Sequence, residues 1–164
     1  MSRLCRGSAE LRIFQKGIKE TVMAAEERKA ISNYRVIYGD TDQMGVVYYA
    51  NYLRWFEIGR TDLLRQIGAP YTAIEKKGLR FPVIEVSCRY YRPSRYDDVI
   101  TIETTLTSLG RATLVFSYRL WRKEDGELIA SGSTKHACVD ETGEVAKIPP
   151  DLEAVLKAAV SAEE

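Results

Sequence analysis

The order of the secondary-structure patterns along the chain predicts an α+β fold, in which one long helix lies on a curved antiparallel sheet. A short strand pattern comes first, one long amphipathic helix pattern follows it, and four more strand patterns then run in succession. Two of those strands flank the segment KEDGEL, Lys123 to Leu128, whose Asp-Gly pair is typical of a hairpin turn. Since no long linker interrupts this order, we expect a single domain over residues 33–164.

The segment before the first strand shows little of the apolar periodicity that is typical of core-forming elements. Residues 1–32 mix basic and acidic side chains around a weak helical stripe. We interpret residues 1–32 as an N-terminal extension, either a loose helical arm or an over-long start before an internal initiator at Met23. Removal of the chain up to about Ala30 is therefore expected to leave catalysis intact.

The first strand pattern and the long helix follow each other closely. YRVIYGD, Tyr34 to Asp40, combines β-branched and aromatic residues and ends at a Gly-Asp pair, as a short strand does. From Asn51 the chain shows a three-to-four spacing that predicts a helix, and Gly68 supplies its stop. The recurring positions are Tyr52, Leu53, Phe56, Arg60, Leu63, Leu64 and Ile67.

Four strand patterns and a terminal helix complete the domain after the loop GAPYTAIEKKGLR. The first three strands alternate apolar residues over 84–90, 100–106 and 114–120, whereas Leu128 to Val139 includes small and polar residues and has no clear facing. The segment IPPDLEAVLKAAV then predicts a helix with Asp151 as its cap. One face of that helix carries Leu152, Val155, Leu156 and Ala159.

Composition and charge exclude several classes of protein. With 24 basic and 23 acidic residues the net charge is +1, which gives no broad cationic field for nucleic acid or for stable association with an anionic membrane. Cys5, Cys88 and Cys138 are odd in number and widely spaced, so neither a disulfide framework nor a zinc knuckle is indicated. No apolar run approaches the roughly 20 residues of a membrane-spanning helix. We expect a cytoplasmic protein.

The absence of several sequence motifs excludes further classes of enzyme. The chain has no G-x-S-x-G elbow, no phosphate loop and no dinucleotide fingerprint. His136 is the only histidine and lies in a strand pattern, so we interpret it as structural or surface-exposed rather than as a metal ligand. Cys88 and Cys138 alternate with apolar residues and are interpreted as core residues. We therefore expect no metal and no other cofactor.

A calcium loop is the one metal site that the sequence suggests, and the match is incomplete. Asp40, Asp42 and Gly45 occupy the first, third and sixth positions of such a loop. Met44 and Asn51, however, stand where an oxygen ligand and a bidentate glutamate are required. Calcium binding is therefore disfavoured.

Asp40 and Asp42 have two interpretations. Both residues are common in turns and helix caps, so a purely structural role would account for them. Alternatively, a carboxylate that precedes an apolar helix can gain basicity by desolvation and act as a general base or nucleophile. The unpaired N–H groups at the start of the helix would then stabilise an oxyanion.

The stretch YGDTDQMGVVYYANYLRWFEIGR, Tyr38 to Arg60, resembles the signature of the 4-hydroxybenzoyl-CoA thioesterase and YbgC-like acyl-CoA thioesterase family. The resemblance continues through FPVIEVSCRYYRPSRYDDVITIETTL and ASGSTKHACVDETGEVAKIPPDL, and so covers about Tyr34 to Leu152. It implies a hotdog fold, in which the sheet wraps around the long helix.

The resemblance also implies catalytic residues. The family carboxylate that acts as general base or nucleophile corresponds to Asp42, and the amide that polarises the thioester carbonyl corresponds to the backbone N–H of Tyr49. A tyrosine that assists the YbgC-like members matches Tyr38, and Glu57 matches a helix position that is acidic in several members. Many YbgC-like members have histidine in place of Tyr49, whereas the 4-hydroxybenzoyl branch also has tyrosine there.

Substrate contacts are implied in the same way. Gly45, Val46 and Val47 of the signature are expected to contact the substrate, and Arg111, in the turn LGRAT, falls where the family can place a residue that binds the phosphates of coenzyme A. Further basic candidates are Arg89, Arg92 and Arg95.

The expected function is that of an acyl-CoA thioesterase, which hydrolyses an acyl-CoA to a free acid and coenzyme A. The resemblance implies a homo-oligomer, most simply a dimer of dimers, with active sites between subunits. Two alternatives stay open, namely a non-catalytic module that binds acyl-CoA or acyl-carrier protein, and a hotdog acyl-CoA dehydratase. Release of free thiol would separate the thioesterase from the binding module, and a double-bond product would identify the dehydratase.

Overall fold

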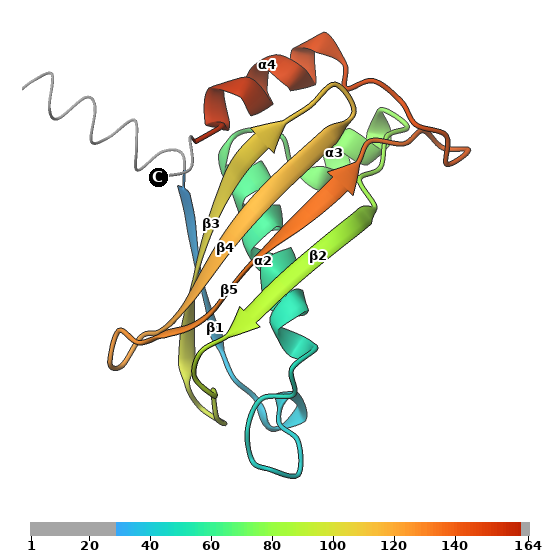
Figure 1. The fold of residues 1–164 in the computed structure, drawn as a ribbon. Helices are drawn as coiled ribbons and strands as arrows, with labels where there is room; N and C mark the ends of the chain where they lie inside the picture. The colour runs from blue at the N-terminus through green and yellow to red at the C-terminus, as the bar shows by residue number, and fades with distance from the viewer. Residues whose placement is uncertain (1–28, 162–164) are drawn as a thin grey trace, which may run out of the picture.

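The computed structural model describes residues 29–161, which form one five-stranded antiparallel sheet with helices packed against it (Figure 1). The strands lie in the order β1-β3-β4-β5-β2. Their bounds are β1 (Lys29–Arg35), β2 (Val83–Tyr90), β3 (Val99–Leu109), β4 (Thr113–Arg122) and β5 (Leu128–Ala137). The helices are a short 3-10 helix η1 (Tyr38–Asp40), α2 (Asn51–Gln66), α3 (Tyr71–Lys76) and α4 (Pro150–Ala159). The predicted α+β hotdog architecture is confirmed.

The long helix α2 lies along one face of the sheet, behind the strands in the view of Figure 1. It approaches the sheet closely because glycines stand at two contact points. A Cβ atom on Gly59 would lie 2.1 Å from the Thr104 hydroxyl oxygen, and one on Gly132 would lie 2.7 Å from the Phe56 ring. Phe56 instead stacks on Tyr118 of β4, with ring centroids 4.3 Å apart.

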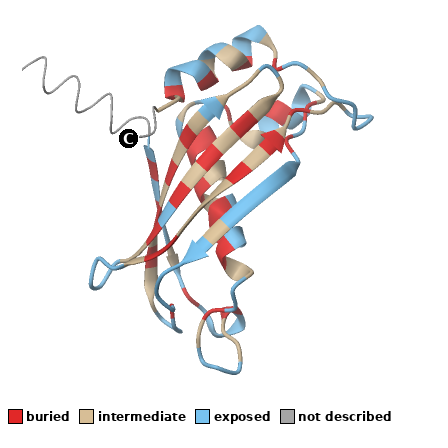
Figure 2. Cartoon of the chain, in the orientation of Figure 1, coloured by how far each residue is buried: buried red, intermediate tan, exposed pale blue. Residues whose placement is uncertain are grey.

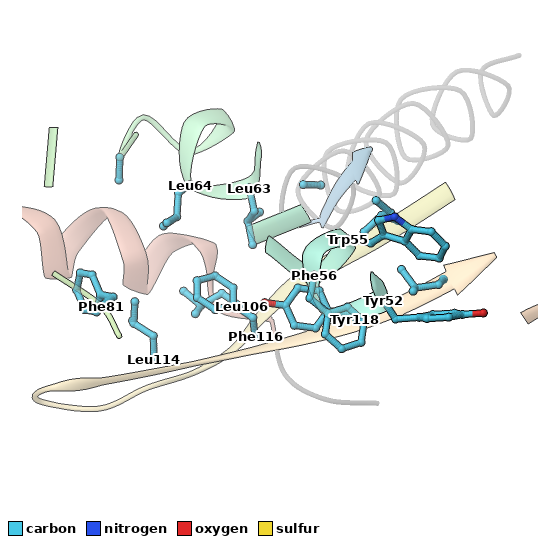
Figure 3. Packing of buried hydrophobic residues seen from close by; sticks show 14 of the residues in the cluster. Tyr52, Trp55, Phe56, Leu63, Leu64, Phe81, Leu106, Leu114, Phe116 and Tyr118 are labelled. Carbon is cyan, nitrogen blue, oxygen red and sulfur yellow. The ribbon is translucent and has the colours of Figure 1, made fainter. Parts of the chain in front are cut away.

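The core lies between α2 and the sheet, and alternating residues of β3 and β4 supply one side of it (Figure 3). The apolar alternation predicted for these two strands is confirmed. In β5 the buried positions include Ile129 and Ala130 together with Thr134 and His136, which explains why the sequence pattern of this strand is mixed. The helix stripe is confirmed for most positions, but Leu53 is exposed and Trp55, outside the predicted stripe, has no exposed surface.

Strand β2 differs from the expectation of a half-buried strand. It has the predicted apolar alternation, yet it lies at the edge of the sheet and seven of its eight residues are exposed (Figure 2). Among its exposed side chains are Val83, Ile84, Val86 and Tyr90. Alternation identifies a strand but cannot show whether a neighbouring element covers it.

Three boundaries also differ from expectation. The first strand runs over Lys29–Arg35, where Ala30 is buried, so the expected start of the domain at residue 33 falls inside β1. The segment Tyr38–Asp40, expected to end that strand, is a 3-10 helix. Residues 71–76, expected to be loop, form α3. The expectations for residues 1–28 lie outside the described part of the chain.

The C-terminal helix α4 crosses the end of the sheet near the β3–β4 hairpin (Figure 1). Leu152, Leu156 and Ala159 are buried as predicted. Pro149 rather than Asp151 is the N-cap residue, and Asp151 forms an ion pair with Lys77. None of the helices within residues 29–161 is long and apolar enough to cross a membrane.

Candidate active site

A tight turn between η1 and α2 presents the Asp42 side chain. Antiparallel pairing of Thr41 with Val47 closes the base of the turn, and the Asp42 N–H donates to the Val46 carbonyl at 2.9 Å. Gly45 has φ +71°, a left-handed conformation that glycine adopts without strain. One carboxylate oxygen of Asp42 accepts a hydrogen bond from the Met44 N–H at 2.8 Å. Its second oxygen accepts none from residues 29–161, so it is available to a substrate or water.

Asp40 has a different environment, because it is buried and fully engaged. Its carboxylate accepts hydrogen bonds from the Tyr34 hydroxyl at 2.8 Å, the Ile37 N–H at 3.1 Å and the Arg54 guanidinium at 3.1 Å. Its carbonyl accepts from the Tyr48 N–H and from the Asn51 side chain. Asp40 therefore joins the end of β1, the turn and the first residues of α2.

The turn and the start of α2 form one wall of a pocket of about 360 Å³. The opposite wall comes from the end of β2 and the residues that follow it. Ten residues line the pocket, namely Asp42, Met44, Val46, Val47, Tyr49, Tyr52, Tyr90, Tyr91, Arg92 and Pro93. Apart from Asp42 and Arg92, the lining is aromatic and apolar.

Tyr49 lines the pocket just before α2 begins. The Tyr49 carbonyl accepts a hydrogen bond from the Tyr90 hydroxyl at 2.9 Å. The Tyr49 N–H has no hydrogen-bond acceptor in the described part of the chain. No side chain caps α2, whose N-cap residue is Ala50. This helix start therefore retains the partial positive charge of free amide groups.

Burial affects ionisable groups in the pocket wall and beside it. It raises the pKa of the Tyr52 phenol and of the Cys88 thiol. Burial, assisted by a hydrogen bond with Cys88, also raises the pKa of Tyr90. These groups are therefore uncharged near neutral pH, and they act here as donors, acceptors and packing surface. No cluster of three His, Cys, Asp or Glu side chains within residues 29–161 is arranged to hold a metal ion.

The structure brings some of the predicted site residues together and separates others. Asp42, Tyr49, Val46 and Val47 line the pocket, and Gly45 forms the turn between them. Glu57 does not line this pocket. It lies instead in a groove of about 400 Å³ on another face of α2.

Tyr38 and Arg111 also lie outside the pocket. Tyr38 stacks on Tyr96, with ring centroids 3.8 Å apart. Arg111 is in the β3–β4 turn, at the end of the sheet opposite to the turn that carries Asp42 (Figure 1). Arg111 therefore does not line this pocket within one chain.

Sequence reasoning missed most of the aromatic wall. The sequence pattern identifies Tyr52 and Tyr90 only as positions of a helix and a strand, and it assigns Met44 and Tyr91 no role in the pocket. Arg92 was one of several basic candidates, and its position in the pocket wall now distinguishes it from Arg89 and Arg95. The run of tyrosines was visible in the sequence, but nothing in it shows that β2 lies beside the turn.

The fold and the pocket together define a hotdog-fold protein with an acidic group beside the start of its central helix. A family model described as the thioesterase-like superfamily matches residues 36–156, and the chain belongs to this superfamily. A solved structure of a hypothetical protein from Thermus thermophilus superposes with a TM-score of 0.75, is 35% identical in sequence, and covers 80% of this chain and 97% of its own.

Curated relatives agree with this family. A protein of Bacillus subtilis named putative acyl-CoA thioesterase YneP is 38% identical over 106 residues, 65% of this chain and 76% of its own length. The acyl-CoA thioester hydrolase YbgC of Escherichia coli O157:H7 is 37% identical over 106 residues, 65% of this chain and 78% of its own. The sequence-based expectation of a thioester hydrolase is confirmed.

Proposed function

We propose that this protein hydrolyses acyl-CoA thioesters to a free acid and coenzyme A, with Asp42 as the reacting carboxylate. The observation that carries this proposal is that Asp42 and Tyr49 line a single, mostly apolar pocket, and that the Tyr49 N–H has no acceptor among the described residues. Relatives that share more than a third of their aligned residues with this chain are named acyl-CoA thioesterases or thioester hydrolases.

The free carboxylate oxygen of Asp42 supports two routes. As a general base it takes a proton from water while the water oxygen bonds to the thioester carbon. The C–S bond then breaks, and the proton passes from Asp42 to the departing thiolate. As a nucleophile, Asp42 bonds to the acyl carbon, expels the thiolate and forms an anhydride that water hydrolyses. Both routes consume one water and regenerate the carboxylate.

The start of α2 supplies the electrostatic part of the mechanism. Both routes place negative charge on the carbonyl oxygen of the substrate in the tetrahedral state. The N–H of Tyr49 and the positive end of the α2 dipole stabilise that charge. Because the pocket wall is mostly apolar, such a hydrogen bond is worth more there than in water.

Binding of the coenzyme A moiety requires positive charge near the pocket. Arg92 supplies one such group at the pocket wall, and Glu127 lies 3.5 Å from it. Arg111 does not line the pocket of its own chain, and a second copy could bring its β3–β4 turn there. We infer a homo-oligomer for this reason, and because the exposed apolar edge β2 requires cover.

Thiol release from a panel of short-chain, long-chain and aromatic acyl-CoA substrates tests this function. We expect turnover of at least one class and formation of the free acid in equal amount. Tight binding without thiol release would favour a binding module, and an unsaturated product that retains the thioester would favour a dehydratase.

A further inference from the structure

We infer that Tyr90 is a positioning residue for the reaction, because its hydroxyl bonds to the backbone of Tyr49, a pocket-lining residue whose N–H has no acceptor among the described residues. This inference rests on the proposed function. It concerns a residue on an edge strand that is distant in sequence from the turn carrying Asp42.

The segment that leads into α2 is held at three successive points. The Val47 N–H donates to the Ser94 carbonyl at 2.8 Å, and the Tyr48 N–H donates to the Asp40 carbonyl at 2.8 Å. At Tyr49 the anchor is the Tyr90 hydroxyl, 2.9 Å from the carbonyl oxygen. Along the described chain, no other hydrogen bond holds the Tyr49 backbone.

The geometry of the backbone explains why this bond affects the amide. The carbonyl and the N–H of Tyr49 belong to two peptide planes that meet at its Cα atom. Fixing the carbonyl limits rotation about the bonds of that Cα, and so restricts the direction of the N–H. An oxyanion donor contributes fully only when it is aligned before charge develops.

The Tyr90 ring is itself held in place. It packs edge-on against Tyr52 of the first turn of α2, with ring centroids 4.9 Å apart. Burial and the neighbouring Cys88 thiol raise the pKa of its phenol, so the hydroxyl stays protonated and donates throughout the neutral range. Tyr90→Phe therefore removes the donor and leaves the ring packing in place.

The test compares Tyr90→Phe with Tyr71→Phe. Tyr71 is a matched control, since its hydroxyl also bonds to a backbone group, the Phe81 N–H at 3.0 Å, and it does not line the pocket. We expect Tyr90→Phe to lower kcat about five- to tenfold, the loss expected when one neutral hydrogen bond orients the transition state, with KM unchanged. Tyr71→Phe should change Tm by a similar amount and leave kcat unaltered.

The result separates this inference from the proposed function. If the wild-type protein hydrolyses an acyl-CoA and Tyr90→Phe has the same kcat, the positioning role is overturned and the function stands. A kcat loss in Tyr71→Phe as large as that in Tyr90→Phe would also overturn it, since the effect would then follow stability. A wild-type protein that releases no thiol from any substrate would overturn the proposed function and this inference with it.

Discussion

Asp40 and Asp42 are two residues apart in the chain, yet their environments differ, as expected if only Asp42 reacts. Asp40 has no exposed surface and accepts hydrogen bonds from Tyr34, Ile37 and Arg54. Asp42 lines the pocket and uses one carboxylate oxygen to hold the Met44 N–H. A fully bonded carboxylate is poorly placed to take a proton, whereas one with a free oxygen is available to react.

Asp42→Asn should abolish most of the activity and preserve the fold. Asparagine keeps the shape of the side chain and the acceptor for Met44 but removes the charge and the basicity. We expect turnover to fall on the order of a hundredfold or more, with Tm nearly unchanged. Thiol release and thermal unfolding of the same preparation measure both quantities, and an activity within a few-fold of wild type would refute the catalytic role.

Asp40→Asn should have the opposite profile. It should destabilise the fold more than Asp42→Asn does, and it should lower turnover less. The amide has only one acceptor oxygen, so at least one of the buried partners of Asp40 loses its bond, and the pair with Arg54 loses its charge. We expect the free energy of unfolding to fall on the order of 1–3 kcal/mol. Urea unfolding of Asp40→Asn beside Asp42→Asn provides the comparison, and equal midpoints would contradict this assignment.

Part of the candidate site could be predicted, residue by residue, from the sequence. The resemblance named Asp42 and the Tyr49 backbone, and both residues line one pocket, because they belong to a contiguous segment whose local geometry a motif can encode. Their catalytic roles stay predictions. It could not identify the wall formed by Tyr90 and Tyr91. That wall depends on pairing between β2 and β5, and contacts between distant segments leave no local pattern in a single sequence.

At the scale of the elements, close contact between α2 and β3 depends on the missing side chain of Gly59. Alanine favours a helix by about 1 kcal/mol over glycine, but here its Cβ would lie 2.1 Å from the Thr104 hydroxyl oxygen and 2.8 Å from Ile102. We expect Gly59→Ala to destabilise the protein by about 1–3 kcal/mol through overpacking. Urea unfolding measures the change.

Thr104→Ala supplies a second variant for that contact. The Thr104 hydroxyl is buried and has no hydrogen-bond partner among the described residues, so its removal alone should cost little. Combined with Gly59→Ala, it should recover part of the lost stability, and the double-mutant cycle should give a clear coupling energy. Strictly additive effects would show that the two residues do not clash.

A buried hydrogen-bonded chain connects β4 and β5 to the segment before β2. The Tyr118 hydroxyl lies 2.7 Å from the Thr134 hydroxyl, which lies 2.8 Å from Nε2 of His136, and Nδ1 of His136 lies 2.9 Å from the Phe81 carbonyl. The chain is complete when His136 is neutral, because Nδ1–H then donates to the carbonyl and Nε2 accepts from Thr134. His136 thus has a structural role.

This chain predicts a pH dependence of stability. Burial lowers the pKa of His136 in the folded protein, and the charge of Arg60 adds to that effect. The unfolded chain, with a histidine pKa near 6.5, therefore binds the proton more readily, and stability is lost as pH falls below about 6.5 towards the folded pKa. Urea unfolding between pH 8 and pH 5 should show this decline, and His136→Gln should reduce it. An equally steep decline in the variant would assign the effect to other groups.

At the scale of the whole molecule, the sheet order β1-β3-β4-β5-β2 places the first two strands of the chain at opposite edges. Sequence patterns identified the strands and the hairpin between β4 and β5. They did not place β2, which follows α3 and pairs with β5 rather than with the strand that comes next in the chain. Local periodicity reports which side of a strand is apolar, whereas pairing between non-consecutive strands depends on the assembled core.

The exposed edge β2 is the basis of the last prediction, which concerns assembly. Val86 of β2 is 46% exposed, and Val83 and Ile84 of the same strand are 46% and 56% exposed, so a single chain leaves an apolar strand edge open to solvent. Pairing with β2 of a second copy would cover it and is compatible with two-fold symmetry. We expect sedimentation to show a dimer or a dimer of dimers and no active monomer.

Substitution of one edge residue at a time tests which edge is used. Val86→Lys should shift the protein towards monomer and reduce turnover, because a charge would be buried in the pairing. Ile31→Lys is the control, since Ile31 is 57% exposed on β1 at the opposite edge of the same sheet. It should leave assembly and activity unchanged. A wild-type monomer with full thioesterase activity, or dissociation by Ile31→Lys and not by Val86→Lys, would exclude an assembly through β2 and, with it, the contribution of Arg111 from a second chain paired at that edge.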